Sequence, residues 1–433
     1  MTLTTNVRSK LACVTTAALM FPLLAPATAS AAAMAPKATQ EMSFWDAMSG
    51  GEAWLRFRPR YEYSSQDNAL TNANAFTMRT ILGYKTAQFK GFDALLEFAN
   101  VTNLSKNKNY NDNVAGTAGY SVVADPGSTV VNQAVLNFHG LQDTKINLGR
   151  QVINLDTDRF VGDVGWRQTA QRYDSVMMTN TSLANTKATY IYAWGVERIF
   201  GVAAVGNAKR YDAATHLVNV AFEPAKWGKF VPYAYLINNK NQAYSSSDTY
   251  GLRFTGESPE YSNGISAIYT AEYATQKGAH NNTSTTKFNF MNFELGAKNQ
   301  MFSALVGYEF LGGNGTNAFV TPYSTIHKFN GWADLFINQN PTTSNALNGI
   351  KDTYLGLTAN MYDIKATARY HDFRADSVNM HYGNELDLSV SKSFNKNVNV
   401  LAKFADYRKK DSNAANTTIN TKKFWLQTSV SFN

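Results

Sequence analysis

Hydrophobic and polar residues alternate along most of this chain, most clearly in its last ten residues, 424–433. Within them, Leu426, Val430 and Phe432 share one parity and are apolar, whereas Gln427, Ser429 and Ser431 share the other and are polar. Successive side chains of a β-strand point to opposite faces, so this segment is apolar on one face and polar on the other. A strand of this kind, with an aromatic residue at its end, is typical of a transmembrane β-barrel, which meets lipid outside and water inside.

The same period-two pattern recurs in about eighteen segments, an even number as single-chain bacterial barrels require. Each segment with its connection averages roughly 22 residues, which suits antiparallel neighbours joined by alternately short and long connections. The sequence therefore predicts an all-β fold, a transmembrane antiparallel β-barrel of about 18 strands. The longest polar connections are 105–128, 240–248, 274–286 and 312–349. The predicted strands are 52–63, 76–85, 93–101, 130–138, 144–152, 172–179, 188–194, 216–222, 230–237, 250–255, 265–273, 287–297, 302–310, 352–361, 364–371, 385–391, 397–404 and 424–432.

The polar face of the first predicted strand carries Arg56, Arg58 and Arg60. In a soluble sandwich these would form the solvated face, whereas in a barrel they point into the lumen. A guanidinium stays charged and binds carboxylate or phosphate in a bidentate way, so arginines in a narrow lumen favour anions. For each arginine the alternative is a neutralised structural ladder, in which the opposing acids are Glu62, Glu97, Glu272 and Asp387. Strand parity predicts that the pore is lined by Arg56, Arg58, Arg60, Arg79, Lys85, Arg253, Lys365 and Arg369.

Arg150 conflicts with the parity of its strand, because Ile146 and Leu148 share its side and would place it towards lipid. That position would cost roughly 2–4 kcal/mol at the bilayer midplane. Either a bulge shifts the register at Gly149, or Arg150 lies beyond the apolar band.

The N-terminus has the features of a secretory signal, expected to span residues 1–31. Arg8 and Lys10 precede an apolar run, and 29–31 is a small-residue cleavage site. Cys13, the only cysteine, lies inside this segment, so no disulfide is expected in the mature chain. We expect residues 32–50 to be a periplasmic lead-in and 51–433 to form the barrel.

Composition excludes several classes of protein. The formal charge of +8 falls to +6 when Arg8 and Lys10 are removed, and only 17% of residues are charged, which does not fit a nucleic-acid binder. No later stretch approaches the roughly 20 apolar residues of a spanning helix. The six histidines lack metal-ligand spacing, and Asp156, Asp158 and Asp163 lack the glycine and glutamate of a calcium loop. We therefore expect no metal and no cofactor.

Two ordered blocks of motifs resemble the alginate export family of outer-membrane porins. The first block comprises 149–151 (GRQ), 158–162 (DRFVG), 166–168 (WRQ) and 171–174 (QRYD). The second comprises 305–313 (LVGYEFLGG), 319–323 (FVTPY), 327–334 (HKFNGWAD) and 349–354 (GIKDTY), and the first strand (54–63) also fits. The resemblance implies an eighteen-stranded, monomeric barrel with an arginine-rich, anion-selective lumen, and it adds Arg150, Arg159, Arg167 and Arg172 to the lumen or an inward loop. The chain departs from the family by ending on Asn433 and by its shorter length.

The leading hypothesis is a bacterial outer-membrane channel, not an enzyme, that passes small anionic solutes. The expected partners are outer-membrane lipid, lipopolysaccharide, the barrel assembly machinery and those solutes, with no nucleic acid. The alternatives are a dedicated exporter of an acidic polysaccharide such as alginate, a barrel phospholipase or protease, and an adhesin. His371 beside Asp372, and His139 after Asn137, are the only hints of a catalytic pair.

Overall fold

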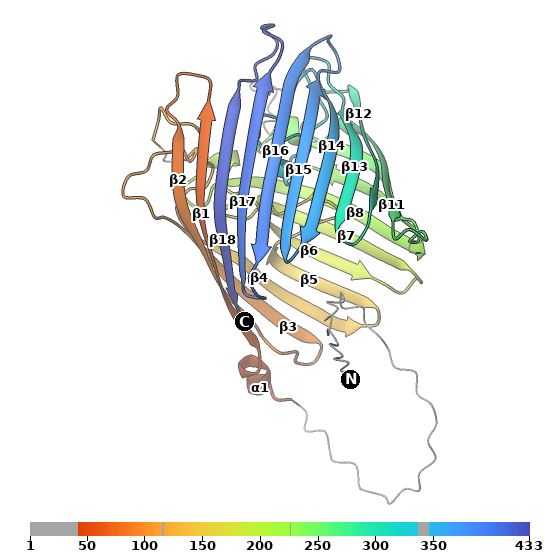
Figure 1. Cartoon of the computed structure of the whole chain (residues 1–433). Coiled ribbons are helices and arrows are strands. Elements are labelled where there is room, and N and C mark those ends of the chain that lie inside the picture. Colours follow the sequence, from red (N-terminus) through yellow and green to blue (C-terminus); the bar gives the residue numbers. More distant parts are fainter. Residues whose placement is uncertain (1–41, 115–116, 226, 337–345) are drawn as a thin grey trace, which may run out of the picture. The chain divides into compact units, whose positions relative to one another are not determined.

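Eighteen strands form one antiparallel sheet that closes into a barrel in the computed structural model, which describes residues 42–114, 117–225, 227–336 and 346–433. Each strand pairs with its neighbours in sequence, and β1 (Glu52–Gln66) closes the barrel by pairing with β18 (Thr421–Phe432) (Figure 1). The predicted fold class is therefore confirmed. The expected signal segment, 1–31, and residues 32–41 of the expected lead-in lie outside the described residues.

Each of the eighteen predicted segments corresponds to a strand, usually extended by a few residues. The remaining strands are β2 (Ala73–Lys85), β3 (Phe92–Asn103), β4 (Ser128–Leu141), β5 (Thr144–Gln151), β6 (Arg172–Asn180), β7 (Thr186–Glu197), β8 (Arg210–Ala225), β9 (Gly228–Ile237), β10 (Ser247–Glu257), β11 (Ser266–Gly278), β12 (Lys287–Lys298), β13 (Phe302–Leu311), β14 (Ile350–Met361), β15 (Ile364–Arg374), β16 (His381–Ser393) and β17 (Val398–Lys409). Residues 274–278, expected in a loop, extend β11 instead.

The described helices are short. They are α1 (Phe44–Ser49), α2 (Gly206–Lys209), η1 (Ala243–Ser245) and η2 (Ile326–Lys328). In the described part of the chain, no helix combines the length and the apolar character needed to cross a membrane. The first helix falls inside the stretch that the sequence predicted to be a loose lead-in.

The two ends of the barrel differ in their connections. At one end, which we call the short-turn end, connections have two to eight residues, whereas at the long-loop end they reach 38 residues in 312–349. The β14–β15 turn shows why short turns form, since Tyr362 and Asp363 both have positive φ, 53° and 61°. Two such residues make the turn type whose twist matches antiparallel strands. In bacterial barrels the short turns face the periplasm.

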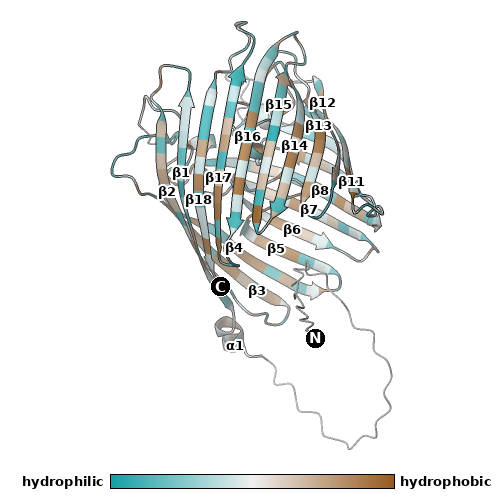
Figure 2. Ribbon diagram, viewed as in Figure 1, coloured by the Kyte–Doolittle hydropathy of each residue, from teal (hydrophilic) through white to brown (hydrophobic). Residues whose placement is uncertain are grey.

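Apolar side chains cover the outside of the barrel. On β16, Leu386, Leu388 and Val390 are 40%, 40% and 50% exposed. The intervening Glu385 and Asp387 are 1% and 0% exposed, because they point inwards. Figure 2 shows hydrophobic residues recurring along the strands in this alternating way. We call the outward-facing side chains of the strands the outer wall.

Two long connections, 152–171 and 312–336, pack against the inner side of the strands rather than projecting away. Val161 and Tyr323 form a parallel bridge between them, in which Gly162 N donates to Tyr323 O at 2.8 Å. Phe160 anchors the first connection by ring contacts with Tyr233 and Phe290, both at 5.2 Å. Together these two segments form what we call the partition.

Candidate functional site

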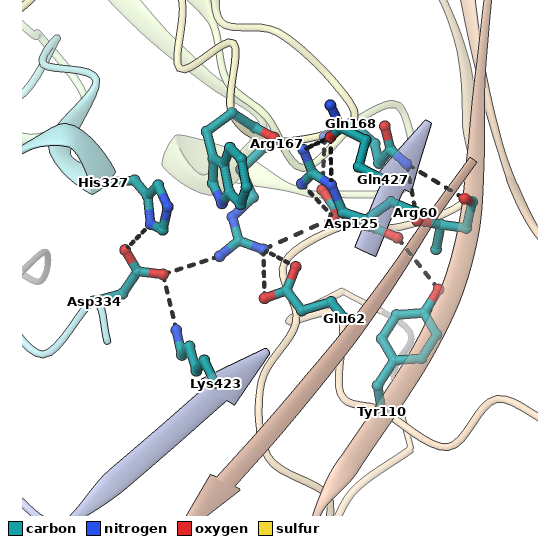
Figure 3. A network of polar contacts seen from close by, with 12 residues as sticks. Arg60, Glu62, Tyr110, Asp125, Arg167, Gln168, His327, Asp334, Lys423 and Gln427 are labelled. Atoms are coloured by element: carbon teal, nitrogen blue, oxygen red, sulfur yellow. Dashed lines mark hydrogen bonds and ion pairs between the residues drawn. The ribbon is translucent and has the colours of Figure 1, made fainter. Parts of the chain in front are cut away.

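Arg167 is the centre of a buried ion network that ties the partition to the barrel (Figure 3). Its guanidinium contacts Glu62 of β1 at 3.1 Å, Asp125 of the 104–127 connection at 3.8 Å and Asp334 at 3.1 Å. Burial lowers the pKa of Arg167, but the three carboxylates outweigh burial and raise it above its ordinary value. One cation thus joins both long connections to the first strand.

Asp334 continues this network to β18, the strand that pairs with β1. Its carboxylate accepts from His327 Nδ1 at 2.6 Å and from Lys423 Nζ of β18 at 2.8 Å, in addition to Arg167. Burial raises the pKa of Asp334, but His327, Lys423 and Arg167 outweigh it and hold the pKa well below its usual range. Asp334 is therefore ionised at neutral pH.

His327 links Asp334 to Lys403 of β17. Burial lowers the pKa of His327 well below its usual range, so the imidazole is neutral. A neutral ring has one donor and one acceptor nitrogen. Since Nδ1 donates to Asp334, Nε2 accepts from Lys403 Nζ at 2.7 Å. This hydrogen-bonded relay fixes the tautomer of the ring.

Aromatic rings form a layer around the same histidine. Trp166 stacks on His327 with ring centroids 4.4 Å apart and 7° between planes. Lys403 Nζ lies 4.3 Å from the ring centroid of Trp166 and 3.6 Å from that of Trp332, and the Arg60 guanidinium lies 4.2 Å from Trp166. Such cation–π contacts are strongest where water is excluded.

Two of the first-strand arginines hold the partition in place. Arg58 donates to Gln168 Oε1 at 2.9 Å, to Gly165 O at 2.8 Å and to Arg167 O. Arg60 donates to Gln427 Oε1 at 2.7 Å and to Trp166 O, and it lies 3.7 Å from Asp125. Both side chains are buried, at 8% and 0% exposure. Their guanidinium groups therefore anchor the 152–171 connection.

Chambers lie on both sides of the partition, and His327 contributes to both. The chamber towards the short-turn end has a volume of about 760 Å³, and the chamber towards the long-loop end about 290 Å³. Six basic and five acidic side chains surround the larger chamber. Three of these basic groups are paired with acids, Arg159 with Glu309, Arg253 with Glu272 and Lys328 with Asp158. The other three are Lys365, Arg369 and Lys403.

The other lumen cations predicted from parity differ in their surroundings. Lys85 lies 3.8 Å from Asp93, and Arg369 lies over the ring of Tyr354 at 5.5 Å. Arg56 is exposed at the short-turn end and lies over Trp54 at 5.5 Å. Arg79 pairs in register with Arg58, and its side chain has no hydrogen bond to any described residue. The neutralising ladder that the sequence left open is thus present for some of the predicted residues and not for others.

Arg150 does not face the lumen in this structure. The β4–β5 and β5–β6 registers continue through Gly149, so Arg150 keeps the side of Leu148, which is 48% exposed on the outer wall. It lies at the long-loop end of β5, where it donates to Asp174 at 2.7 Å and Glu197 at 3.1 Å. Of the two alternatives, the position beyond the apolar band fits, and the lumen assignment is corrected.

Arg172 is also placed differently from the expectation. Its side chain is 2% exposed at the start of β6, on the same side of the strand as Asp174, and it donates to Arg198 O at 3.5 Å. Arg172 is thus buried but borders neither chamber, so it takes part in packing at the long-loop end.

Sequence reasoning missed Lys403, Lys423, Asp125 and Asp334. The first two could have been found, because Lys403 shares the inward side of β17 with the buried Ala405, and Lys423 shares the inward side of β18 with Trp425. The two aspartates lie in connections, where no strand parity exists to assign them. The motif 327–334 did contain Asp334, but nothing in it indicated a partner.

Comparisons with known proteins bear on the fold. No family model matches the chain, and no curated protein matches it. Solved structures do match. Acinetobacter baumannii OccAB3 has a TM-score of 0.68 at 12% identity, covering 88% of this chain and 99% of that one. Pseudomonas aeruginosa OccK9 (OpdG) has 0.67 at 13%, covering 89% and 99%.

A third match is Pseudomonas aeruginosa OpdK with vanillate, with a TM-score of 0.66 at 10% identity, covering 89% of this chain and 99% of that one. These neighbours are outer-membrane porins with eighteen-stranded barrels. The likeness is one of fold. It shows the barrel architecture of outer-membrane porins, and it does not single out the alginate export family.

Proposed function

We propose that this protein is a passive outer-membrane channel that passes small anionic solutes. The observation that supports this most directly is a set of lumen-facing cations that have no ion pair with any described residue. This set comprises Arg56, Arg79, Lys365 and Arg369. Such cations lower the energy of an anion in a narrow, low-dielectric passage.

Several lumen acids oppose this effect less than their number implies. Glu272 and Glu309 are each paired with an arginine, at 2.8 and 2.9 Å. Glu97 and Glu294, by contrast, accept hydrogen bonds from uncharged groups, Trp54 Nε1 and the Tyr354 hydroxyl, both at 2.7 Å, so their negative charges are not cancelled. We therefore propose a modest preference for anions rather than exclusion of cations.

The partition favours small solutes over a polymer. It lies in the lumen at the level of Trp166 and His327, between the two chambers. An acidic polysaccharide would require this layer to move aside, whereas a small carboxylate needs only a narrow gap. The neighbouring structure that holds vanillate, a small carboxylate, agrees with this size class.

A channel of this kind needs no turnover chemistry. Of the two histidines named as catalytic hints, His139 contacts the carboxylate of Asp93 at 2.8 Å, and His371 contacts those of Asp352 at 2.9 Å and Asp387 at 3.7 Å. Among the described residues, no hydroxyl is hydrogen-bonded to the His371 ring, so the arrangement lacks an activated nucleophile.

One closed barrel has its own lumen, and we propose that the protein acts as a monomer.

Reversal potentials in planar bilayers test the proposal. Under a KCl gradient, the wild-type channel should show a reversal potential on the anion-selective side, and Lys365→Ser with Arg369→Ser should move it towards cations. Lys422→Ser is the matched control, because Lys422 lies on the outer side of β18. A wild-type channel that prefers cations, or a double variant with unchanged selectivity, would contradict the proposal.

A further inference from the structure

The helix α1 is specified locally, although it lies in a stretch without strand character. Ser43 Oγ accepts from Asp46 N at 3.1 Å, and Asp46 Oδ2 accepts from Ser43 N at 3.2 Å. These two reciprocal bonds form a capping box, which satisfies backbone donors at a helix start. Residues 43–49 therefore adopt a defined shape beside the barrel.

This helix is fastened to the lipid-facing side of the short-turn end. The Tyr84 hydroxyl donates to Met48 O and accepts from Gly51 N at 3.1 Å, and Ala87 N donates to Ala47 O at 3.0 Å. Tyr84 lies on the same side of β2 as Leu82, which is 57% exposed on the outer wall. The helix thus continues the outer wall beyond the ends of the strands.

Large apolar side chains in and beside α1 are exposed. Met42, Phe44, Trp45 and Met48 are 50%, 50%, 75% and 42% exposed. Four large apolar side chains within seven residues are unfavourable in water, but tryptophan and phenylalanine are favoured where a membrane meets water.

We propose that α1 is an interfacial anchor that inserts Phe44, Trp45 and Met48 into the periplasmic leaflet of the outer membrane. The patch is continuous with the lipid-facing wall, because the ring of Phe44 lies 5.9 Å from that of Phe89, and Phe89 forms a bridge with Phe92, which is 43% exposed. Four side chains are too few for a stable protein interface, which takes about 800 Å² from each partner. Lipid is therefore the occupant that the surface fits.

A fluorescent label at position 45 tests this anchor. The variant Trp45→Cys, in a Cys13→Ser background, would carry an environment-sensitive dye and be refolded into phosphatidylethanolamine–phosphatidylglycerol vesicles containing lipids with shallow or deep nitroxide groups. The control is Lys396→Cys, an exposed site in the 394–397 turn at the same end. We expect shallow nitroxides to quench the label at 45 at least threefold more than the label at 396, and aqueous iodide to show the reverse order.

Equal quenching by lipid at the two sites, or free access of iodide to position 45, would overturn the proposal. Energy transfer between labels at 45 on different molecules would also overturn it, because a second copy would then be the occupant. A second variant, Phe44→Ser with Trp45→Ser, should keep the wild-type conductance and ion selectivity. The anchor can therefore fail while the channel proposal stands, and the reverse is equally distinguishable.

Discussion

The outer wall and the partition lie within one barrel, but they depend on their residues in different ways. The wall repeats the same alternation of outward apolar and inward polar side chains over eighteen strands. Each apolar side chain therefore contributes a similar small part of the stability of the barrel. The partition depends on single contacts between residues far apart in sequence, such as Arg58 with Gln168, 110 positions away. The loss of one apolar side chain from the wall is therefore a small part of the total, whereas a substitution in the partition removes a contact that no other residue replaces.

The largest effect is expected at Arg167. Replacement by Met leaves Glu62, Asp125 and Asp334 buried without their shared cation, and removing one partner of a buried pair costs about 3–5 kcal/mol. We expect the partition to loosen and single-channel conductance to rise several-fold, while the barrel itself stays folded.

Single-channel recording, with heat-modifiable electrophoretic mobility as the folding test, checks this. Arg374→Met is the control, because Arg374 is 57% exposed and its pair with Asp372 is worth little in water. If Arg167→Met conducts like the wild type, the partition does not limit conductance.

A charge on the wall should act on stability rather than on conductance. Leu388→Arg places a cation on the lipid side of β16, at a cost of about 2–4 kcal/mol near the bilayer midplane. Ser389→Arg, one residue further, points inwards and should be tolerated. Urea unfolding in vesicles should separate the two variants, and equal destabilisation of both would mean that the side assignment of β16 is wrong.

The pH dependence of the partition should follow His327. Burial lowers the pKa of His327 while the 312–336 segment is packed in the partition. If that segment is released, the imidazole binds a proton below about pH 6.5, whereas in the packed state it stays neutral. The packed state therefore loses up to about 1.4 kcal/mol per pH unit as pH falls below 6.5, until the packed-state pKa is reached. Asp334, whose pKa is also lowered, keeps its stabilising charge in this window and loses it only in stronger acid.

We expect conductance to rise between pH 7 and pH 5, measured in symmetrical salt. His327→Gln cannot titrate and should flatten the profile. A variant that retains the full wild-type rise would assign the pH response to other groups.

The difference between wall and partition also explains how far sequence reasoning reached. Period-two alternation located every strand, because lipid outside and water inside impose it on each strand separately. It also placed Lys365 and Arg369 beside the larger chamber. It also put Arg58 and Arg60 on the inward side, but it could not show that their guanidinium groups bind backbone carbonyls of the 152–171 connection. The alternation within a strand carries no information about which distant loop will contact it.

The smallest effect is expected for Arg150→Ser, a change on the outer side of the barrel. This residue shares Asp174 and Glu197 with Arg210, whose guanidinium contacts both acids, so Arg150→Ser leaves each carboxylate with a cation. At 27% side-chain exposure the pair is partly screened, and the loss should be about 0–1 kcal/mol. Because Arg150 lies on the outer side, reversal potentials should match the wild type, unlike those of the Lys365 and Arg369 variants. A shift towards cations in Arg150→Ser would return this residue to the lumen and would require a register change at Gly149 that this structure does not contain.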